Sequence, residues 1–310
     1  MTVHVAFAGT FSATLEQPVR NHLDVPCEIV VADEASIAPR LTDTDVLVTL
    51  AFTKEMGRAA RRLKLVQVPG AGLDRIDRSA LPDGTWLANA YGHETGIAEY
   101  VIGAMLALTR DLTRIDAALR RGTWESQWAV GAPSPPAWPE LAGKTLGILG
   151  YGRIGQALAQ RARAFEMTVL PFRRGDALDD VLRQADYLAV TLSLNDTTRG
   201  LIGARELAVM KPTAILVNVA RAQIVDEDAL YQALARKTIA GAALDVWYRY
   251  PTVTGPTWPS RHPFHELPNV LMTPHVSGWT VGMLDARARV IADNIGRVTR
   301  GEPPVNLVRS

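Results

Sequence analysis

Short apolar runs alternate with amphipathic segments along most of the chain. In the first part, apolar runs at residues 3–8, 28–31, 46–50 and 65–68 predict four strands with helical segments between them. The alternation starts again at Lys144. It predicts six further strands, at residues 146–149, 167–170, 187–192, 214–218, 242–246 and 270–272. This pattern is typical of two α/β domains, each built on a parallel sheet.

Two helical segments and one irregular segment interrupt this alternation. Residues 95–121 carry a long helical pattern, with Ile97, Val101 and Met105 on one face, and predict a helix that bridges two domains. Residues 122–139 follow, rich in tryptophan and proline, and Pro133 to Pro136 exclude helix there. This segment either packs on its own chain or docks on a second subunit, and its tryptophans favour the second interpretation. Residues 280–300 predict a last helix that crosses back onto the first domain.

Composition narrows the class of protein. The chain has 310 residues, 47% of them hydrophobic, which suits two domain cores. The net charge is +1 without a long block of like charge, so neither nucleic acid nor an anionic membrane is expected as a partner. The single cysteine, Cys27, excludes an intramolecular disulfide, and no metal site is predicted. The N-terminus lacks the features of a signal peptide, and no apolar stretch suits a membrane span, so a cytoplasmic protein is expected.

A glycine-rich turn stands between a predicted strand and a predicted helix. Its glycines are Gly150, Gly152 and Gly155, in the spacing G-x-G-x-x-G. In a dinucleotide-binding turn the first glycine permits the tight turn, the second admits the pyrophosphate, and the third lets the helix approach the strand. The phosphates then lie at the helix N-terminus, where N–H groups and the dipole favour an anion. An ordinary glycine turn is the alternative, but the flanking strand and helix favour a dinucleotide.

The end of the next predicted strand bears on the choice of cofactor. An acidic residue is typical there, because it accepts a hydrogen bond from the adenosine ribose. Here the position is occupied by Arg173 and Arg174. Guanidinium groups pair with phosphate, so NADP(H) is predicted as the preferred cofactor, with NAD(H) possible. The alternative is that both arginines are solvated surface residues.

Three polar residues follow three consecutive predicted strands. Arg221, Asp245 and His275 each stand at a strand's carboxyl end, where open α/β sheets bind ligands. Each alone has an ordinary interpretation, as a surface charge, a loop cap and a satisfied loop histidine. Together at one sheet edge they indicate a catalytic site.

These motifs resemble those of the D-isomer-specific 2-hydroxyacid dehydrogenase family over almost the full length of the chain. The matching segments are residues 68–74, 97–100, 141–155, 218–221, 245–247 and 273–275. The resemblance implies two Rossmann-like domains, namely a flavodoxin-like substrate domain, residues 1–95 and 284–310, and an NAD(P)-binding domain, residues 96–283. The latter would contain an interdomain helix, 96–121, and a dimer arm, 122–140, and a homodimer would form largely through this domain and its arm.

The resemblance also assigns residues. Arg221 would bind the substrate carboxylate and carbonyl, His275 would be the acid/base, and Asp245 would contact the nicotinamide carboxamide. Backbone N–H groups of Ala71, Gly72 and Leu73 would hold the other carboxylate oxygen, with closure of the two domains expelling water. Expected cofactor contacts are Gly150, Tyr151, Gly152, Arg153, Ile154, Gly155, Arg173, Arg174, Leu192, Ser193, Val219, Ala220, Arg221, Asp245, His275 and Gly278.

Three positions depart from the family pattern. Tyr250, before Pro251, stands where the family has the glutamate that pairs with the histidine. Glu94 is either a first-turn helix charge or a substrate-facing carboxylate that replaces this glutamate or recognises a cationic group. Ala222 replaces a glycine after Arg221. Trp279 and Tyr250 are among the aromatic residues expected to crowd the pocket and to favour a larger, flat or apolar substituent.

The expected reaction is reversible hydride transfer between nicotinamide and a 2-oxo or 2-hydroxy acid, with NADPH-dependent reduction of glyoxylate or hydroxypyruvate as the leading substrate hypothesis. Without a carboxylate partner for His275, reduction is expected to decline with rising pH near an ordinary histidine pKa of roughly 6.5. Two alternatives stay open. The chain could be an NADP(H)-binding sensor or partner-binding protein with little turnover, or a reductase of an imine or other non-carboxylate acceptor that Glu94 recognises.

Overall fold

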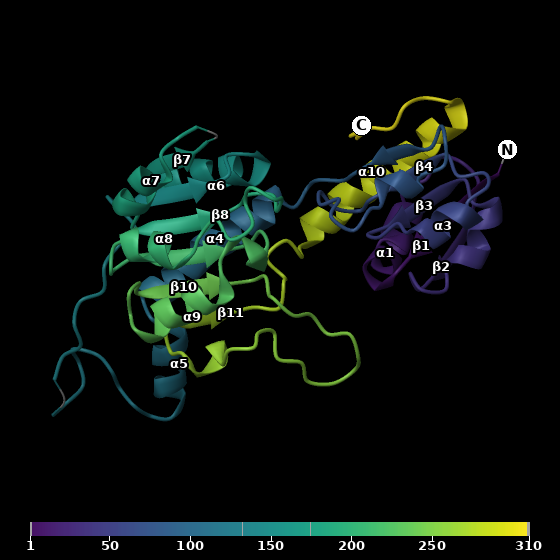
Figure 1. Ribbon diagram of the computed structural model, residues 1–310. Coiled ribbons are helices and arrows are strands. Elements are labelled where there is room, and N and C mark those ends of the chain that lie inside the picture. Colours follow the sequence, from purple (N-terminus) through teal and green to yellow (C-terminus); the bar gives the residue numbers. More distant parts are fainter. Residues whose placement is uncertain (1, 132, 174, 309–310) are drawn as a thin grey trace. The chain divides into compact units, whose positions relative to one another are not determined.

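The computed structural model describes residues 2–131, 133–173 and 175–308, and the chain divides into two compact units. Unit 1 comprises Met1–His93 and Trp279–Ser310, and unit 2 comprises Glu94–Gly278. The predicted domain boundaries fell at 95/96 and 283/284. Both chain ends lie in unit 1 (Figure 1). Each unit is built on a parallel sheet, so the predicted fold class is confirmed.

Unit 1 contains a five-stranded sheet with the order β2-β1-β3-β4-β5. All of its strand pairs are parallel, as the alternation of strands and helices predicted. The strands are β1 (Val3–Ala8), β2 (Cys27–Ala32), β3 (Val46–Thr49), β4 (Leu65–Gln67) and β5 (Trp86–Ala88). Strand β5 was not predicted.

Helices cover both faces of this sheet. One face packs against α10, which contributes Ala288, Ile291 and Ile295 to a core shared with Val5 and Phe7. Helix α10 begins after Thr280, whose hydroxyl accepts a hydrogen bond from Met283 N–H. The helices of unit 1 are α1 (Thr10–Thr14), α2 (Glu16–Arg20), η1 (Ala38–Asp43), α3 (Lys54–Ala59), η2 (Arg78–Ala80) and α10 (Val281–Arg300).

Unit 2 contains a six-stranded sheet with the order β11-β10-β9-β8-β6-β7, again with parallel pairs only. The strands are β6 (Thr145–Leu149), β7 (Thr168–Phe172), β8 (Tyr187–Val190), β9 (Ile215–Asn218), β10 (Gly241–Leu244) and β11 (Val270–Met272). From β6 the chain passes to β7, the neighbour of β6 on one side, and then crosses over to β8, its neighbour on the other side. The crevice at this switch point is where such sheets bind ligands.

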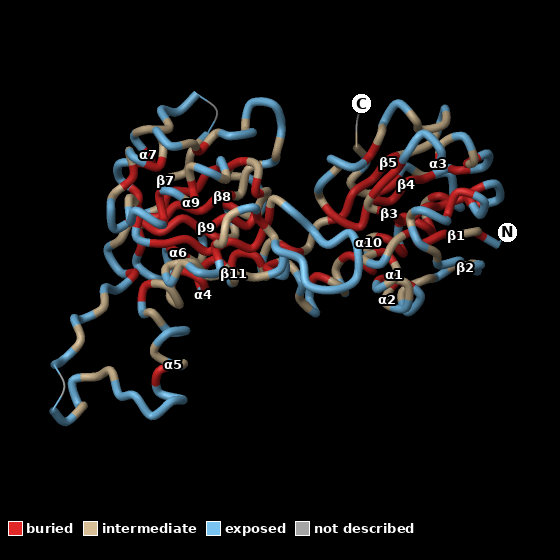
Figure 2. Tube along the Cα trace, turned by 60° about the horizontal axis from the view of Figure 1, so that its bottom comes forward, coloured by how far each residue is buried: buried red, intermediate tan, exposed pale blue. Residues whose placement is uncertain are grey.

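The strands of both sheets form the buried interior of each unit, as Figure 2 shows. In unit 2, α4 and α6 cover one face of the sheet, and α7, α8 and α9 cover the other. These helices and the short turns between them are α4 (Glu94–Thr109), α6 (Arg153–Ala164), α7 (Leu178–Gln184), α8 (Ala204–Val209), η3 (Ala222–Ile224), α9 (Glu227–Ala235) and η4 (Phe264–Glu266). Within the part of the chain that is described, no helix has the length and apolar character to cross a bilayer.

The long helix predicted for residues 95–121 is wrong as a single element. The structure has α4, ending at Thr109, and a separate α5 (Leu112–Arg120). Asp111 between them has φ of 51°, a left-handed conformation that a helix cannot continue through. The following arm, residues 122–140, has neither helix nor strand among its described residues, and Figure 2 shows it mostly exposed.

Candidate active site

The glycine turn joins β6 to α6 at the switch point of the unit 2 sheet. Gly150 has φ of 100°, and a Cβ there would lie 2.8 Å from the backbone nitrogen of Leu192. A Cβ on Gly155 would lie 2.3 Å from the carbonyl oxygen of Gly150. Both glycines are therefore required by contacts within the chain itself, as the spacing predicted.

Gly152 is different, because no atom of the chain lies within 4 Å of a Cβ placed on it. It precedes α6, whose first N–H groups need acceptors. A cavity of about 570 Å³ lies beside it, lined by Gly150, Tyr151, Gln156, Phe172, Arg173 and Leu192. An open backbone at a helix N-terminus beside a cavity fits the pyrophosphate of a dinucleotide.

The far end of this cavity carries a positive charge. Strand β7 ends at Phe172, and the Arg173 guanidinium carbon lies 5.3 Å from the centre of the Tyr151 ring. Arg173 N–H donates to the Asp176 carboxylate at 2.7 Å, so Asp176 closes the turn after the strand. Arg174, the other arginine of the NADP(H) prediction, lies outside the described residues. The residues present fit an adenosine ribose that carries a phosphate.

The predicted catalytic residues follow three strands that are neighbours in the sheet. Arg221 follows β9, Asp245 directly follows β10, and His275 follows β11. Because the strands are parallel, their carboxyl ends share one edge of the sheet. The Asn218 side chain shapes the first turn, since its Oδ1 accepts from Ala220 N–H and its Nδ2 donates to the Arg221 carbonyl. Ala222, the departure from glycine, is buried at the start of η3.

Asp245 is fully buried, and its carboxylate holds the loop that carries His275. Oδ1 accepts hydrogen bonds from Thr273 Oγ1 at 2.6 Å and Val276 N–H at 2.8 Å. Oδ2 accepts from Ser277 N–H at 2.9 Å. The structure thus gives Asp245 a supporting role; the carboxamide contact implied by the resemblance stays a prediction.

His275 lies at the centre of this loop in a left-handed conformation, with φ of 59°. Such a backbone costs a non-glycine residue roughly 1–2 kcal/mol, and the hydrogen bonds to Asp245 oppose its relaxation. In this position, Nδ1 of His275 lies 2.8 Å from the hydroxyl oxygen of Tyr250. The residue that replaces the family glutamate therefore contacts the histidine directly.

The surroundings of His275 disfavour its charged form. The ring keeps some accessible surface, but loss of hydration lowers its pKa below the ordinary value; the Asp245 carboxylate opposes this shift, and the Arg221 guanidinium adds to it. Burial raises the pKa of Tyr250, against the opposing effects of Trp247 N–H and Arg221. Both shifts favour the neutral forms of the two side chains.

Two further residues support the loop, although neither was predicted to do so. The Tyr100 hydroxyl lies 2.6 Å from Thr273 Oγ1, and the Trp247 indole N–H donates to the Thr273 carbonyl at 2.8 Å. Both residues belong to the motifs of the family resemblance. Only the folded arrangement reveals that both contact Thr273.

The remaining predicted residues of the substrate site belong to other segments of the chain. Ala71, Gly72 and Leu73 form the loop after β4 in unit 1. Trp279 also belongs to unit 1, where its ring packs edge-on against Phe11, with the centroids 5.7 Å apart. Glu94 is the first residue of α4, where the helix dipole favours a carboxylate. Its role as a substrate-facing group stays a prediction, as do the cofactor contacts expected of Arg153, Ile154, Ser193, Val219 and Gly278.

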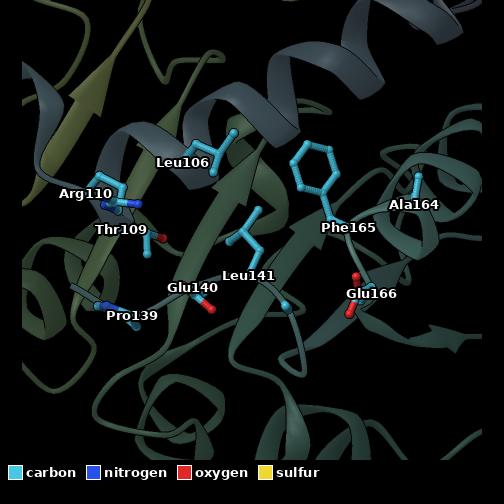
Figure 3. Close-up of a pocket in the computed structure, with 10 residues that line it drawn as sticks. Leu106, Thr109, Arg110, Pro139, Glu140, Leu141, Ala164, Phe165 and Glu166 are labelled. Carbon is cyan, nitrogen blue, oxygen red and sulfur yellow. The ribbon is translucent and has the colours of Figure 1, made fainter. Parts of the chain in front are cut away.

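A second cavity in unit 2, of about 310 Å³, lies at the opposite edge of the sheet (Figure 3). Leu106, Thr109 and Arg110 line it from the C-terminal end of α4, and Phe165 and Glu166 line it from the turn before β7. It therefore opens at the amino ends of β6 and β7, away from Arg221 and His275. It is not the catalytic pocket.

Comparison with known proteins agrees with this geometry. The family model described as D-isomer specific 2-hydroxyacid dehydrogenase, NAD binding domain, matches residues 102–277, which contain the glycine turn and all three strand-end residues. The chain belongs to this family. The predicted family is thereby confirmed, and the protein is a 2-hydroxyacid dehydrogenase that uses a nicotinamide cofactor.

Individual relatives of this dehydrogenase cover most of its length. A glyoxylate reductase of Thermofilum pendens is 33% identical over 323 residues, which span 95% of this chain and 92% of the relative. A D-3-phosphoglycerate dehydrogenase of Methanocaldococcus jannaschii is 34% identical over 288 residues; the match spans 87% of this chain but only 52% of that longer protein. The crystal structure of a D-lactate dehydrogenase from Treponema pallidum is similar over the full length of both chains, with a TM-score of 0.81 and 26% sequence identity.

Proposed function

We propose that this 2-hydroxyacid dehydrogenase reduces a small 2-oxo acid, with glyoxylate and hydroxypyruvate as the leading candidates, and prefers NADPH to NADH. The observation that carries the proposal is the placement of Arg221 and His275 after β9 and β11, on the sheet that carries the dinucleotide turn. Several relatives are named glyoxylate reductase, which supports a small substrate.

The two residues have complementary roles in this reaction. Arg221 binds the substrate carboxylate and polarises the carbonyl, because its planar guanidinium donates two parallel hydrogen bonds. His275 gives a proton to the oxygen that becomes the hydroxyl group. The reduced nicotinamide, when bound, supplies the hydride. Asp245 acts indirectly, because it holds the loop that carries His275.

The preference for NADPH rests on the residues after β7. Strand β7 ends at Phe172, and Arg173 follows it beside the nucleotide cavity. No carboxylate occupies the position of Arg173, where one would accept from an unmodified ribose. Its guanidinium instead suits the 2′-phosphate of NADPH.

Initial rates of NADPH and NADH oxidation test the proposal. The assay uses purified protein and a panel of 2-oxo acids from glyoxylate to phenylpyruvate. The expected result is turnover of the small acids with a higher kcat/KM for NADPH. Comparable kcat/KM values for the two cofactors would overturn the preference. Tight NADPH binding without turnover of any acid would overturn the substrate class and point to a different acceptor, such as an imine.

The assembly proposed for this enzyme is a homodimer that uses the arm, residues 122–140. Trp124 and Trp128 are 63% and 78% exposed in the single chain. Such large apolar side chains are uncommon on a surface that stays in water. A second copy of the chain is the partner that would cover them.

A further inference from the structure

The hydroxyl group of Tyr250 lies between two hydrogen-bonding groups of unit 2. The backbone N–H of Trp247 points to its oxygen at 3.4 Å, and Nδ1 of His275 lies 2.8 Å from the same oxygen. An amide N–H can only donate, so it occupies a lone pair of the phenol oxygen. The phenol keeps its hydrogen for a second partner, and an unprotonated Nδ1 can accept it.

This arrangement is the reverse of what a carboxylate partner would impose. A glutamate can only accept, so it would hold the hydrogen of a neutral imidazole on Nδ1 and leave Nε2 as a bare acceptor. A tyrosine can donate instead, and a neutral His275 that accepts from it carries its hydrogen on Nε2. A neutral histidine of this kind still presents a donor to a substrate oxygen.

We propose that Tyr250 is a positioning residue and proton source for His275, which fixes the Nε2–H tautomer and returns a proton to Nδ1 when Nε2–H is given up. The proposal rests on the proposed reduction and deepens it. The carbonyl carbon gains the hydride of the reduced nicotinamide, and its oxygen takes the proton from Nε2. The Nε2–H and Oη–H bonds break while O–H and Nδ1–H form, which leaves a phenolate. After the product leaves, the Nδ1 proton returns to the phenolate oxygen and water protonates Nε2, which releases hydroxide and restores the starting tautomer.

The geometry supports both halves of this transfer. Tyr250 is 47% exposed, so solvent can reach the phenolate. Loss of hydration raises the pKa of Tyr250 and so opposes the phenolate, as does the buried Asp245 carboxylate; Trp247 N–H and the Arg221 guanidinium reduce this shift. An alkoxide is more basic than a phenolate, so the net transfer from Tyr250 to the product oxygen is favourable even though a transfer to His275 alone is not.

The surroundings of the imidazole disfavour the imidazolium as the proton donor. His275 has a pKa below its ordinary value because of lost hydration, with Asp245 opposing and Arg221 adding to the shift. An imidazolium is therefore scarce at and above pH 7. If the imidazolium were the donor, the reduction rate would fall about tenfold for each pH unit above this lowered pKa. Donation through Tyr250 removes this limit, contrary to the decline near pH 6.5 expected from the sequence.

The first test measures the tautomer of His275 in the protein without substrate or cofactor. Nitrogen-15 NMR of histidine-labelled protein distinguishes protonated from unprotonated ring nitrogens, and His275→Gln assigns the signals. In the wild type we expect a protonated Nε2 and a hydrogen-bonded, unprotonated Nδ1 at neutral pH. Tyr250→Phe should shift the Nδ1 signal toward that of a free acceptor, and Tyr250→Glu should move the proton to Nδ1 and raise the pKa of His275. A protonated Nδ1 in neutral wild-type His275 would overturn the proposal, whether or not any 2-oxo acid is turned over.

The second test is the pH profile of kcat for reduction. We expect a wild-type rate that is nearly level from pH 6 to 9, and a Tyr250→Phe rate that falls about tenfold per pH unit across this range. Tyr248→Phe is the matched control, because Tyr248 donates to the Val225 carbonyl at 2.9 Å and should keep the wild-type profile. Parallel profiles for the wild type and Tyr250→Phe would show that Tyr250 supplies no proton and would overturn the relay.

Discussion

A fully buried carboxylate, Asp245, holds the His275 loop through three hydrogen bonds to groups of that loop. Two of the donors are the backbone N–H groups of Val276 and Ser277, which directly follow His275. Without these bonds the loop would be free to leave the left-handed conformation that brings His275 to Tyr250. The charge of Asp245 therefore affects catalysis through the position of a neighbouring ring.

Asp245→Ala is expected to lower both stability and activity. Each buried donor left without an acceptor costs about 1–3 kcal/mol, so the Tm should fall by several degrees. The kcat for reduction should fall more than KM rises, because His275 is displaced while Arg221 is retained. Thermal unfolding and steady-state kinetics measure the two effects. Asp196→Ala, on an exposed loop, is the control that should change neither. An Asp245→Ala protein with wild-type kcat would contradict the supporting role.

Arg173 is expected to determine the choice between the two cofactors. Arg173→Ala should raise KM for NADPH about tenfold or more, the typical effect of losing a charge-assisted hydrogen bond, and leave KM for NADH almost unchanged. Arg183→Ala, on the exposed surface of α7, is the matched loss of charge and should affect neither cofactor. An equal rise of KM for both cofactors in Arg173→Ala would mean that Arg173 does not bind the 2′-phosphate.

For single residues, the sequence predicts the position in the fold better than it predicts the side-chain contacts. The strand-end positions of Arg221, Asp245 and His275 follow from the apolar runs before them. The pairing of Tyr250 with Nδ1 does not, because it depends on the left-handed turn at His275, and histidine gives no sequence signal for such a turn. The hydrogen bonds that Asp245 makes within the protein cannot be predicted from the sequence for the same reason.

At the scale of elements, the glycine turn contains one glycine that folding requires and another whose backbone is open to a ligand. A Cβ on Gly155 would overlap the Gly150 carbonyl oxygen, whereas a Cβ on Gly152 would meet no atom within 4 Å. Gly155→Ala should therefore lower the Tm by several degrees. Gly152→Ala should keep the wild-type Tm but weaken NADPH binding, because the methyl group occupies the approach of the pyrophosphate. Calorimetric binding and thermal unfolding measure the pair. Unchanged NADPH affinity in Gly152→Ala would show that the cofactor does not approach this backbone.

The elements that the sequence predicts well are those with long apolar runs. All six strands of the unit 2 sheet lie in runs of this kind, and α10 has a clear beginning at Thr280. The break between α4 and α5 is not visible, because the helical pattern continues across Asp111 and only its backbone conformation ends the helix.

At the scale of the whole molecule, the arm leaves two tryptophan side chains largely uncovered. Trp124 and Trp128 belong to an arm without helix or strand among its described residues. A buried tryptophan removes roughly 150–250 Å² from water, and each 100 Å² of apolar area contributes about 2.5 kcal/mol. Covering these two side chains therefore favours the association of two copies of the chain.

Sedimentation velocity tests this assembly. The chain has a mass of 33.7 kDa, so a dimer has twice that mass. We expect the wild type to sediment as a dimer and the double variant Trp124→Ala/Trp128→Ala to sediment mainly as the single chain at low micromolar concentration. Trp258→Ala removes a tryptophan of the same exposure, 64%, outside the arm and should stay dimeric. The proposal that a second copy of the chain covers the arm tryptophans would be contradicted by a wild type that sediments as a single chain. It would equally be contradicted by an arm variant that stays fully dimeric. Because loss of the arm contacts leaves Arg221, Asp245 and His275 on an intact sheet, the single chain should still bind NADPH, which separates assembly from cofactor binding.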